Sequence, residues 1–182
     1  MSMKKINAWM SLITTGLILM HEGYQLYAYA AFYYNPTLSA VTGFALLFVM
    51  LIHAILSGIS CFVVHDSKRI AYKLSNRRTV LQRVSAVASI LLLPLHVCAF
   101  SLLMFAPSDL IRYLTAGSQV LFYASINTHA AVSVGNAFIT LGWLTDRKKR
   151  EILGRLAWIV CVVLIFAVSI LITVTQLKLT MR

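Results

Sequence analysis

The sequence predicts an all-α integral membrane protein that crosses a bilayer with five helices, and three observations lead to this fold class. Of its 182 residues, 60% are hydrophobic and only 12% are charged, whereas a soluble domain has about 25% charged and 45–50% apolar residues. The apolar residues fall in blocks of about 20 or more, the length that a helix needs to cross a bilayer. Five such blocks use roughly 110 residues. We therefore expect a single membrane domain over residues 1–182 and no soluble catalytic domain.

Short polar connectors separate the blocks and define the expected helices in order. The first helix follows two N-terminal lysines and ends at an uncharged connector, 32–40, which contains an Asn-Pro turn. The second ends at a basic connector, 65–83. The third ends at connector 106–118, the fourth ends at the basic connector 145–155, and the fifth leads to the C-terminus. The five expected spans are 7–31, 41–64, 84–105, 119–144 and 156–176.

The distribution of charge predicts the orientation of these helices. The net charge is +11, but the basic residues lie between apolar blocks, so we interpret them as a topology signal and not as a nucleic-acid surface. Thirteen of the 16 basic residues flank the N-terminus and the connectors 65–83 and 145–155. Because Lys and Arg concentrate on cytoplasmic flanks, we expect a multi-pass protein of the inner membrane with a cytoplasmic N-terminus and an external C-terminus. Trp9, Trp143 and Trp158 lie beside the basic side, as interfacial anchors do.

Four histidines lie within the first four spans, one in each, and we interpret them as haem ligands. They are His21, His53, His96 and His129, while His65 falls at the inner boundary and is expected to be interfacial. A single histidine in a membrane helix is commonly explained by an interhelical hydrogen bond. One in each of four consecutive helices is harder to explain in that way, and neutral imidazole is a common ligand of b-type haem. The prediction is a four-helix haem-binding bundle with two bis-histidine haems, plus one extra helix.

The spacing of the histidines predicts how they pair. His21 and His53 are 32 residues apart, and His96 and His129 are 33 apart, so the chain consists of two helical hairpins followed by the extra helix. Neighbouring helix axes lie only 8–10 Å apart, which is tight for an imidazole–iron–imidazole unit, whereas the diagonal of a bundle is longer. Diagonal helices in an up-down bundle are the first and third and the second and fourth. We therefore expect one haem iron between His21 and His96 and the other between His53 and His129.

Three further residues are candidates for the site, each with a plainer alternative. Glu22, the only acid within an expected span, either carries protons to or from a quinone or forms a helix contact. Arg83, at the inner end of the third span, either binds a haem propionate or a quinone oxygen or extends to lipid headgroups. Ser85 lies on the same helical face as His96 and either lines a haem or allows close helix packing.

Two local stretches resemble a known family. LQRVSA at 81–86, followed by apolar residues up to His96, is similar to the Gln/Arg-x-Ser-Gly…His helix of the di-haem cytochrome b membrane subunit of succinate:quinone and quinol:fumarate oxidoreductases. THAA at 128–131, followed by TLGW at 140–143, resembles the next helix of that family. Helices with histidine in the first four of five, and an N-terminus inside, are also similar to that subunit.

The resemblance implies both a ligand pairing and a set of partners. It implies ligands from the first and third helices for one haem b and from the second and fourth for the other, with menaquinone or ubiquinone as the membrane quinone. The subunit would transfer electrons without binding the dicarboxylate itself. It would anchor an iron–sulfur subunit and a flavoprotein subunit that interconverts succinate and fumarate. The basic connectors would face these partners or anionic membrane lipids.

Two other functions are compatible with the same residues. A b-type cytochrome that anchors a hydrogenase or formate dehydrogenase shares the haem chemistry but has different partners. A haem-free transporter or scaffold would use the histidines as interhelical hydrogen-bonding groups. The three cysteines form no Cys-x-x-Cys motif, so covalently attached haem is not expected in any of these cases.

Overall fold

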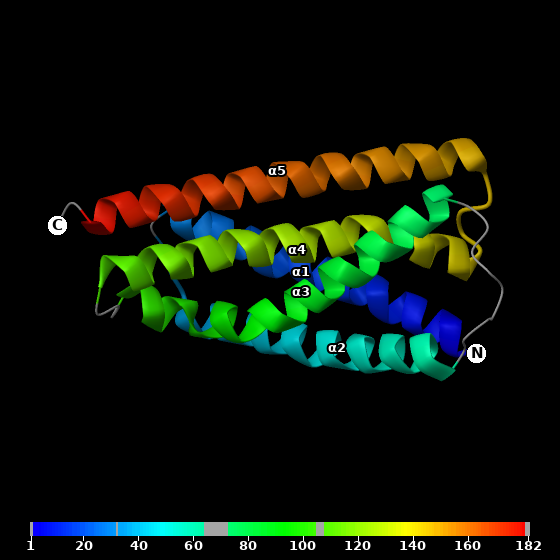
Figure 1. Cartoon of the computed structure of the whole chain (residues 1–182), viewed down its shortest axis with the longest axis horizontal. Helices are drawn as coiled ribbons and strands as arrows, with labels where there is room; N and C mark the ends of the chain where they lie inside the picture. The colour runs from blue at the N-terminus through cyan, green and yellow to red at the C-terminus, as the bar shows by residue number, and fades with distance from the viewer. Residues whose placement is uncertain (1, 32, 64–72, 105–107, 181–182) are drawn as a thin grey trace. The chain divides into compact units, whose positions relative to one another are not determined.

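The computed structural model describes the backbone of residues 2–31, 33–63, 73–104 and 108–180, and the side chains of all of these except residues 29, 60–63, 73–76, 100–104 and 175–180. Every regular element in these ranges is helical. The five helices are α1 (Met3–Ala31), α2 (Pro36–Val63), α3 (Lys73–Met104), α4 (Asp109–Leu141) and α5 (Arg147–Thr180) (Figure 1). The expected all-α fold with five helices is confirmed.

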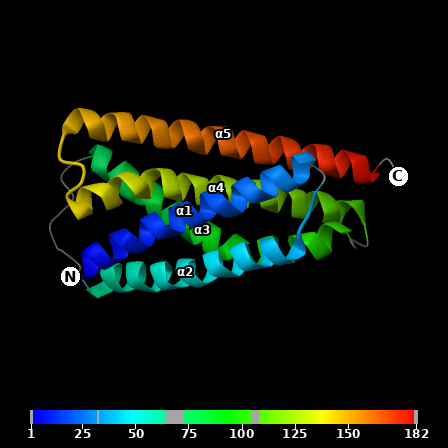
Figure 2. The same cartoon turned by 180° about the vertical axis from the view of Figure 1, so that it is seen from behind.

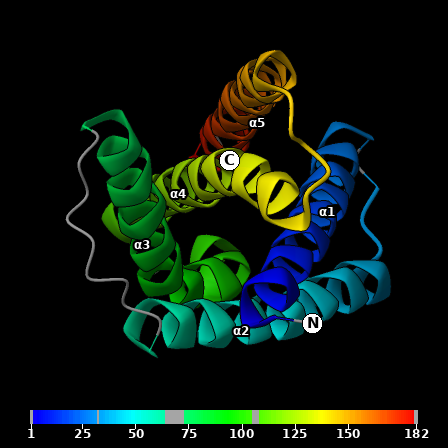
Figure 3. The same cartoon turned by 90° about the vertical axis from the view of Figure 1, so that its right-hand side faces the viewer.

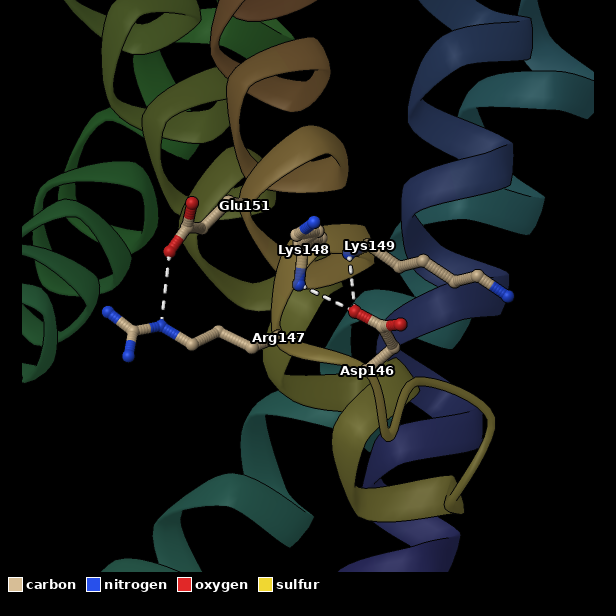
Figure 4. A network of polar contacts seen from close by, with 5 residues as sticks. All are labelled: Asp146, Arg147, Lys148, Lys149 and Glu151. Carbon is tan, nitrogen blue, oxygen red and sulfur yellow. Dashed lines mark hydrogen bonds and ion pairs between the residues drawn. The ribbon is translucent and has the colours of Figure 1, made fainter.

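Side-chain caps mark where α2 and α5 begin. Asn35 Oδ1 accepts a hydrogen bond from the backbone N–H of Leu38 at 3.1 Å, and Pro36 occupies the first helical position, where a missing N–H costs nothing. Asp146 Oδ1 accepts hydrogen bonds from the backbone N–H groups of Lys148 and Lys149 at 2.6 and 3.3 Å (Figure 4). Both caps satisfy donors that the first turn of a helix leaves without intrahelical partners.

The C-terminal end of α4 is a Schellman motif centred on Gly142. The backbone of Gly142 has φ +82°, its N–H donates to the carbonyl of Ile139 at 3.0 Å, and the N–H of Trp143 donates to the carbonyl of Phe138 at 3.0 Å. Only glycine adopts this left-handed conformation without strain. The glycine of the TLGW stretch therefore has a backbone role, which is to end the helix.

Three helices begin well before their apolar blocks. α3 begins at Lys73 rather than at 84, α4 at Asp109 rather than at 119, and α5 at Arg147 rather than at 156. These helices extend beyond the expected spans, because hydropathy marks only the part of a helix that suits hydrocarbon and the polar residues beside that part can continue the helix. The 33 residues of α4 span about 50 Å at 1.5 Å per residue, against a hydrocarbon core of about 30 Å.

The remainder of the expected connector 65–83 cannot be compared in this way. Its residues up to 72, including His65, lie outside the described residues.

Three of the described helices are long and apolar enough to cross a membrane. The qualifying segments are Pro36–Ile59 in α2, Arg77–Ala99 in α3 and Arg147–Val174 in α5. No segment of α1 or α4, in which the sequence also predicts spans, meets this criterion over the described residues. α1 carries two lysines and Glu22, and α4 contains many hydroxyl and amide side chains. The structure is thus consistent with a membrane protein, with three helices that satisfy the criterion.

Buried side chains concentrate on α1 and α4. Of the 20 buried residues among the described side chains, six lie on α1, nine on α4 and none on α2, and nine of the 20 are polar or charged. Large apolar side chains are instead exposed, such as Phe44 and Leu91, each with 71% of its surface accessible. This distribution is the reverse of that in a water-soluble protein. So large an apolar exterior requires lipid or a protein partner to cover it.

The chain divides into two compact units. Unit 1 consists of Met1–Lys73 and Val132–Leu156, and unit 2 consists of Leu74–Ala131 and Ala157–Arg182. α1 and α2 thus belong to unit 1, most of α3 belongs to unit 2, and both α4 and α5 contribute a segment to each unit.

In unit 1, α1 and α2 form an antiparallel hairpin (Figure 2). At the turn, the Tyr24 hydroxyl donates to the carbonyl of Asn35 at 3.0 Å and accepts from the N–H of the same residue at 2.8 Å. Towards the other end of the hairpin, the Ser57 hydroxyl donates to Asn7 Oδ1 at 3.1 Å. Polar contacts therefore tie the two helices together near both ends.

A second contact in unit 1 joins α1 to the segment that follows α4. The Trp9 and Trp143 rings meet edge to face, with centroids 5.0 Å apart, and Phe138 lies 5.6 Å from Trp143. Two of the three tryptophans that the sequence places beside the basic connectors are therefore in direct contact.

In unit 2, α3 and the first part of α4 are antiparallel partners. Ser89 and Ser125 share a hydrogen bond of 3.0 Å between the two helices. Residues 157–180 of α5 run alongside residues 109–131 of α4 (Figures 1 and 3), and the buried residues of α5 are Cys161 and Val168.

Candidate functional site

The four histidines predicted as ligands lie on four different helices. His21 on α1 and His53 on α2 belong to unit 1, whereas His96 on α3 and His129 on α4 belong to unit 2. All four side chains are partly buried. Hydrogen bonds within each unit hold three of these imidazoles, and in unit 2 the partner atoms define the tautomer of two.

His129 is held by a backbone carbonyl of α3. Its Nδ1 lies 2.9 Å from the carbonyl oxygen of Gln82. Because a carbonyl oxygen can only accept, Nδ1 must carry the proton and donate. In the neutral ring the lone pair then resides on Nε2.

His96 is held by a buried amide of α4. Its Nδ1 lies 2.8 Å from Gln119 Oε1, and the same amide donates from Nε2 to the carbonyl of Leu95 at 3.3 Å. The second bond identifies which end of the amide is nitrogen, so the end that faces the imidazole is the acceptor oxygen. Nδ1 of His96 is therefore a donor as well.

Aromatic side chains of α4 also constrain the His96 ring. Phe122 stacks on it with centroids 4.3 Å apart and planes 15° from parallel, and Tyr123 meets it edge-on at 5.5 Å. Positions three and four residues beyond Gln119 share its helical face. One face of α4 thus sets both the hydrogen bond and the plane of the ring.

His21 shows the same pattern with a hydroxyl as its partner. Its Nδ1 lies 3.2 Å from Thr42 Oγ1 on α2. The Thr42 hydroxyl also lies 2.9 Å from the carbonyl of Leu38 in its own helix, so it can accept from His21 while it donates to that carbonyl. A Cβ on Gly43 would lie 3.4 Å from His21 Cε1, so the ring packs closely against the α2 backbone there.

His96 and His129 have the tautomer that suits a metal ligand, and the contact of His21 with Thr42 is compatible with the same tautomer. A histidine that binds a metal through one ring nitrogen usually donates the other N–H to a carbonyl or another polar oxygen, and b-type haem iron takes neutral imidazole in its axial positions. The donor chemistry of His21, His96 and His129 therefore fits haem iron. Among the residues whose side chains are described, no group of three or more His, Cys, Asp or Glu gathers as a site for a bare metal ion.

Ser85 and Arg83 differ in their surroundings. Ser85 is buried, and its hydroxyl lies 2.7 Å from the carbonyl of Leu81 and 3.1 Å from that of Gln82. Since the Gln82 carbonyl also accepts from His129, Ser85 and His129 share a partner on α3, in addition to the helical face that Ser85 shares with His96. Arg83 is exposed, which favours an interfacial role.

Glu22, the candidate proton carrier, is 4% exposed. It lies on α1 directly after His21. Burial of this extent is compatible with a proton carrier and equally with a helix contact.

Sequence reasoning did not identify Gln82, Gln119 or Thr42 as partners of the histidines. A signal for the α3–α4 contacts exists, because Gln82, Ser89 and His96 recur every seven residues and therefore share one face of α3. Each of the three has its partner on α4. The Gln82 contact uses a backbone atom, which leaves no trace in residue identity.

No protein family, curated protein or solved structure matches this chain.

Proposed function

We propose that this protein is the membrane anchor and b-type cytochrome subunit of a succinate dehydrogenase or fumarate reductase. It would transfer electrons between a membrane quinone and cytoplasmic iron–sulfur and flavoprotein subunits. The observation that carries the proposal is that Nδ1 of His21, His96 and His129 is in each case hydrogen-bonded to an oxygen of a neighbouring helix. One histidine in each of four consecutive helices adds to it.

Two haem b groups would be held by His21 with His96 and by His53 with His129. Bound haem supplies a one-electron carrier. The chain itself orients the imidazoles through their Nδ1–H bonds, which also raise the basicity of the ligating nitrogen.

All five helices would cross the inner membrane, including α1 and α4. Their polar side chains are largely buried, as the burial of Ser11, Thr14, Gln119 and Asn127 illustrates. A helix whose polar groups face protein is tolerated in a bilayer, because those groups need not meet hydrocarbon. That α1 and α4 have no segment that meets the spanning criterion over the described residues is therefore compatible with five spans.

The basic start of α5 would face the cytoplasm and the soluble subunits. Arg147, Lys148 and Lys149 are exposed, and Glu151 neutralises only part of their charge through a 3.3 Å ion pair with Arg147 (Figure 4). Such a surface attracts acidic protein surfaces and anionic lipid headgroups. Glu22 is the candidate proton carrier for the quinone.

A haem-free scaffold or transporter is the second candidate, and the same hydrogen bonds favour it. Contacts such as His96–Gln119 join helices whether or not iron is present. An anchor of a hydrogenase or formate dehydrogenase would share the haem but not the partners.

A haem measurement tests the proposal directly. The full chain, purified from membranes of a haem-producing host, should contain about two haems per chain by the pyridine haemochrome method, with a b-type reduced-minus-oxidised spectrum. The variant His65→Ala is the matched control and should retain both, because His65 is not among the proposed ligands. A colourless wild-type protein overturns the cytochrome function. Co-purification with iron–sulfur and flavoprotein subunits active towards succinate or fumarate distinguishes this complex from other respiratory enzymes.

A further inference from the structure

We infer that Gln119 is a positioning residue for His96: it fixes the tautomer and the direction of that imidazole so that Nε2 is presented to haem iron. The inference rests on the proposed function and identifies a residue that would control one of the two haems. Gln119 is 4% exposed and lies on α4, in the same unit as His96.

The side-chain amide of Gln119 is held in one orientation. Gln119 Nε2 donates to the carbonyl of Leu95 at 3.3 Å, so its Oε1 is the atom 2.8 Å from His96 Nδ1. Gln119 therefore contacts two successive residues of α3, one through its nitrogen and one through its oxygen. A flipped amide would place its oxygen against the Leu95 carbonyl oxygen, where neither atom can donate, and would lose that bond. The pair of contacts therefore locks the amide in one orientation.

The plane and the rotation of the His96 ring are both constrained by α4. The hydrogen bond defines which edge of the imidazole faces α4, and the stack on Phe122, with planes 15° from parallel, defines the plane of the ring. With both fixed, the ring cannot rotate without losing one contact. The Nε2 lone pair then has a single direction relative to α3, which removes an orientational cost of binding iron.

A further polar contact between α3 and α4 can be compared with that of Gln119. Ser89 and Ser125 also join these helices, at 3.0 Å. Neither of these hydroxyls is bonded to a ligand imidazole in the contacts described above. A purely structural role for Gln119 predicts that losing either interhelical contact has the same effect, whereas a positioning role predicts an effect on one haem only when Gln119 is changed.

The test uses the full chain purified from membranes, with haem content and low-spin ferric EPR signals as readouts. Gln119→Leu removes both polar groups at similar size and should weaken retention of one haem about tenfold, as loss of an outer-shell partner typically does, with altered EPR g-values for that haem alone. Gln119→Glu retains an acceptor oxygen and should rescue both haems. The control Ser89→Ala should leave haem content and both EPR signals unchanged.

The outcomes separate the inference from the proposed function. If wild-type protein holds two haems and Gln119→Leu has the wild-type content and EPR signals, the positioning role is overturned while the cytochrome function stands. If Gln119→Glu loses the haem as fully as Gln119→Leu, or Ser89→Ala does the same, the positioning role is also overturned. A wild-type protein without haem overturns the function and the inference together. Should Gln119→Leu not fold, as judged by helical circular dichroism, the Gln119→Glu and Ser89→Ala arms decide.

Discussion

Removal of one oxygen atom at the α1–α2 turn should destabilise the protein measurably. The Tyr24 hydroxyl donates to the carbonyl of Asn35 and accepts from its N–H, at 3.0 and 2.8 Å. Asn35 in turn caps α2 through its side chain. A single phenol thus holds the residue from which the second helix begins, and Tyr24→Phe removes both bonds while retaining the ring.

The magnitude follows from counting which groups lose a partner. The Asn35 carbonyl still accepts from the N–H of Ser39 at 3.0 Å, so its loss is partly compensated. The Asn35 N–H has no such replacement. With a net value of about 0.5–1.5 kcal/mol for each hydrogen bond, Tyr24→Phe should lower the free energy of unfolding by about 1–2 kcal/mol.

Equilibrium unfolding in detergent mixtures with increasing dodecyl sulfate, followed by far-ultraviolet circular dichroism, measures this difference. Tyr27→Phe is the matched control, because Tyr27 lies one turn further along α1 and is 60% exposed. It should change stability by less than about 0.5 kcal/mol, as surface substitutions generally do. Equal stabilities for the two variants would refute the assignment of the turn to Tyr24.

Three further predictions concern the haem ligands and the ends of helices. His96→Ala should remove one of two haems by pyridine haemochrome assay and leave the other; unchanged haem content would contradict the ligand assignment. Gly142→Ala should lower unfolding free energy by about 1–2 kcal/mol because φ there is +82°, whereas Gly154→Ala, inside α5 with open space around its Cα, should raise it by about 0.5–1 kcal/mol. A loss at both glycines would speak against the backbone argument. Asp146→Ala should cost about 1 kcal/mol through loss of the α5 cap, and Asp146→Asn much less; equal losses would contradict the capping role.

The helices were predictable because their cause is local in the sequence. Apolar blocks of bilayer length, separated by polar connectors, predict five helices, and the described residues form five helices. Their starts at Lys73 and Arg147 were not predictable in the same way. Hydropathy reports the solvent that a helix suits, and basic residues extend a helix into water without changing its backbone.

The candidate site was likewise predictable only in part. That His21, His53, His96 and His129 lie in separate helices follows from their spacing along the chain. That Gln119 faces His96 depends on the rotation and register of two helices, which are set by packing along their whole length. Sequence spacing on α3 indicates a polar face, but it does not indicate which residue of α4 meets it.

An all-helical chain with apolar segments suited to a membrane and one histidine in each of its first four helices is predictable without a structure, because helix length, hydropathy and residue identity are properties of the chain alone. The choice of the donor nitrogen in His96 and His129 became clear only from the folded structure. Its cause is a contact between helices: the carbonyl of Gln82 and the amide of Gln119 accept from Nδ1 of His129 and His96. An acceptor held at one edge of an imidazole leaves the lone pair at the other edge, and that choice comes from packing.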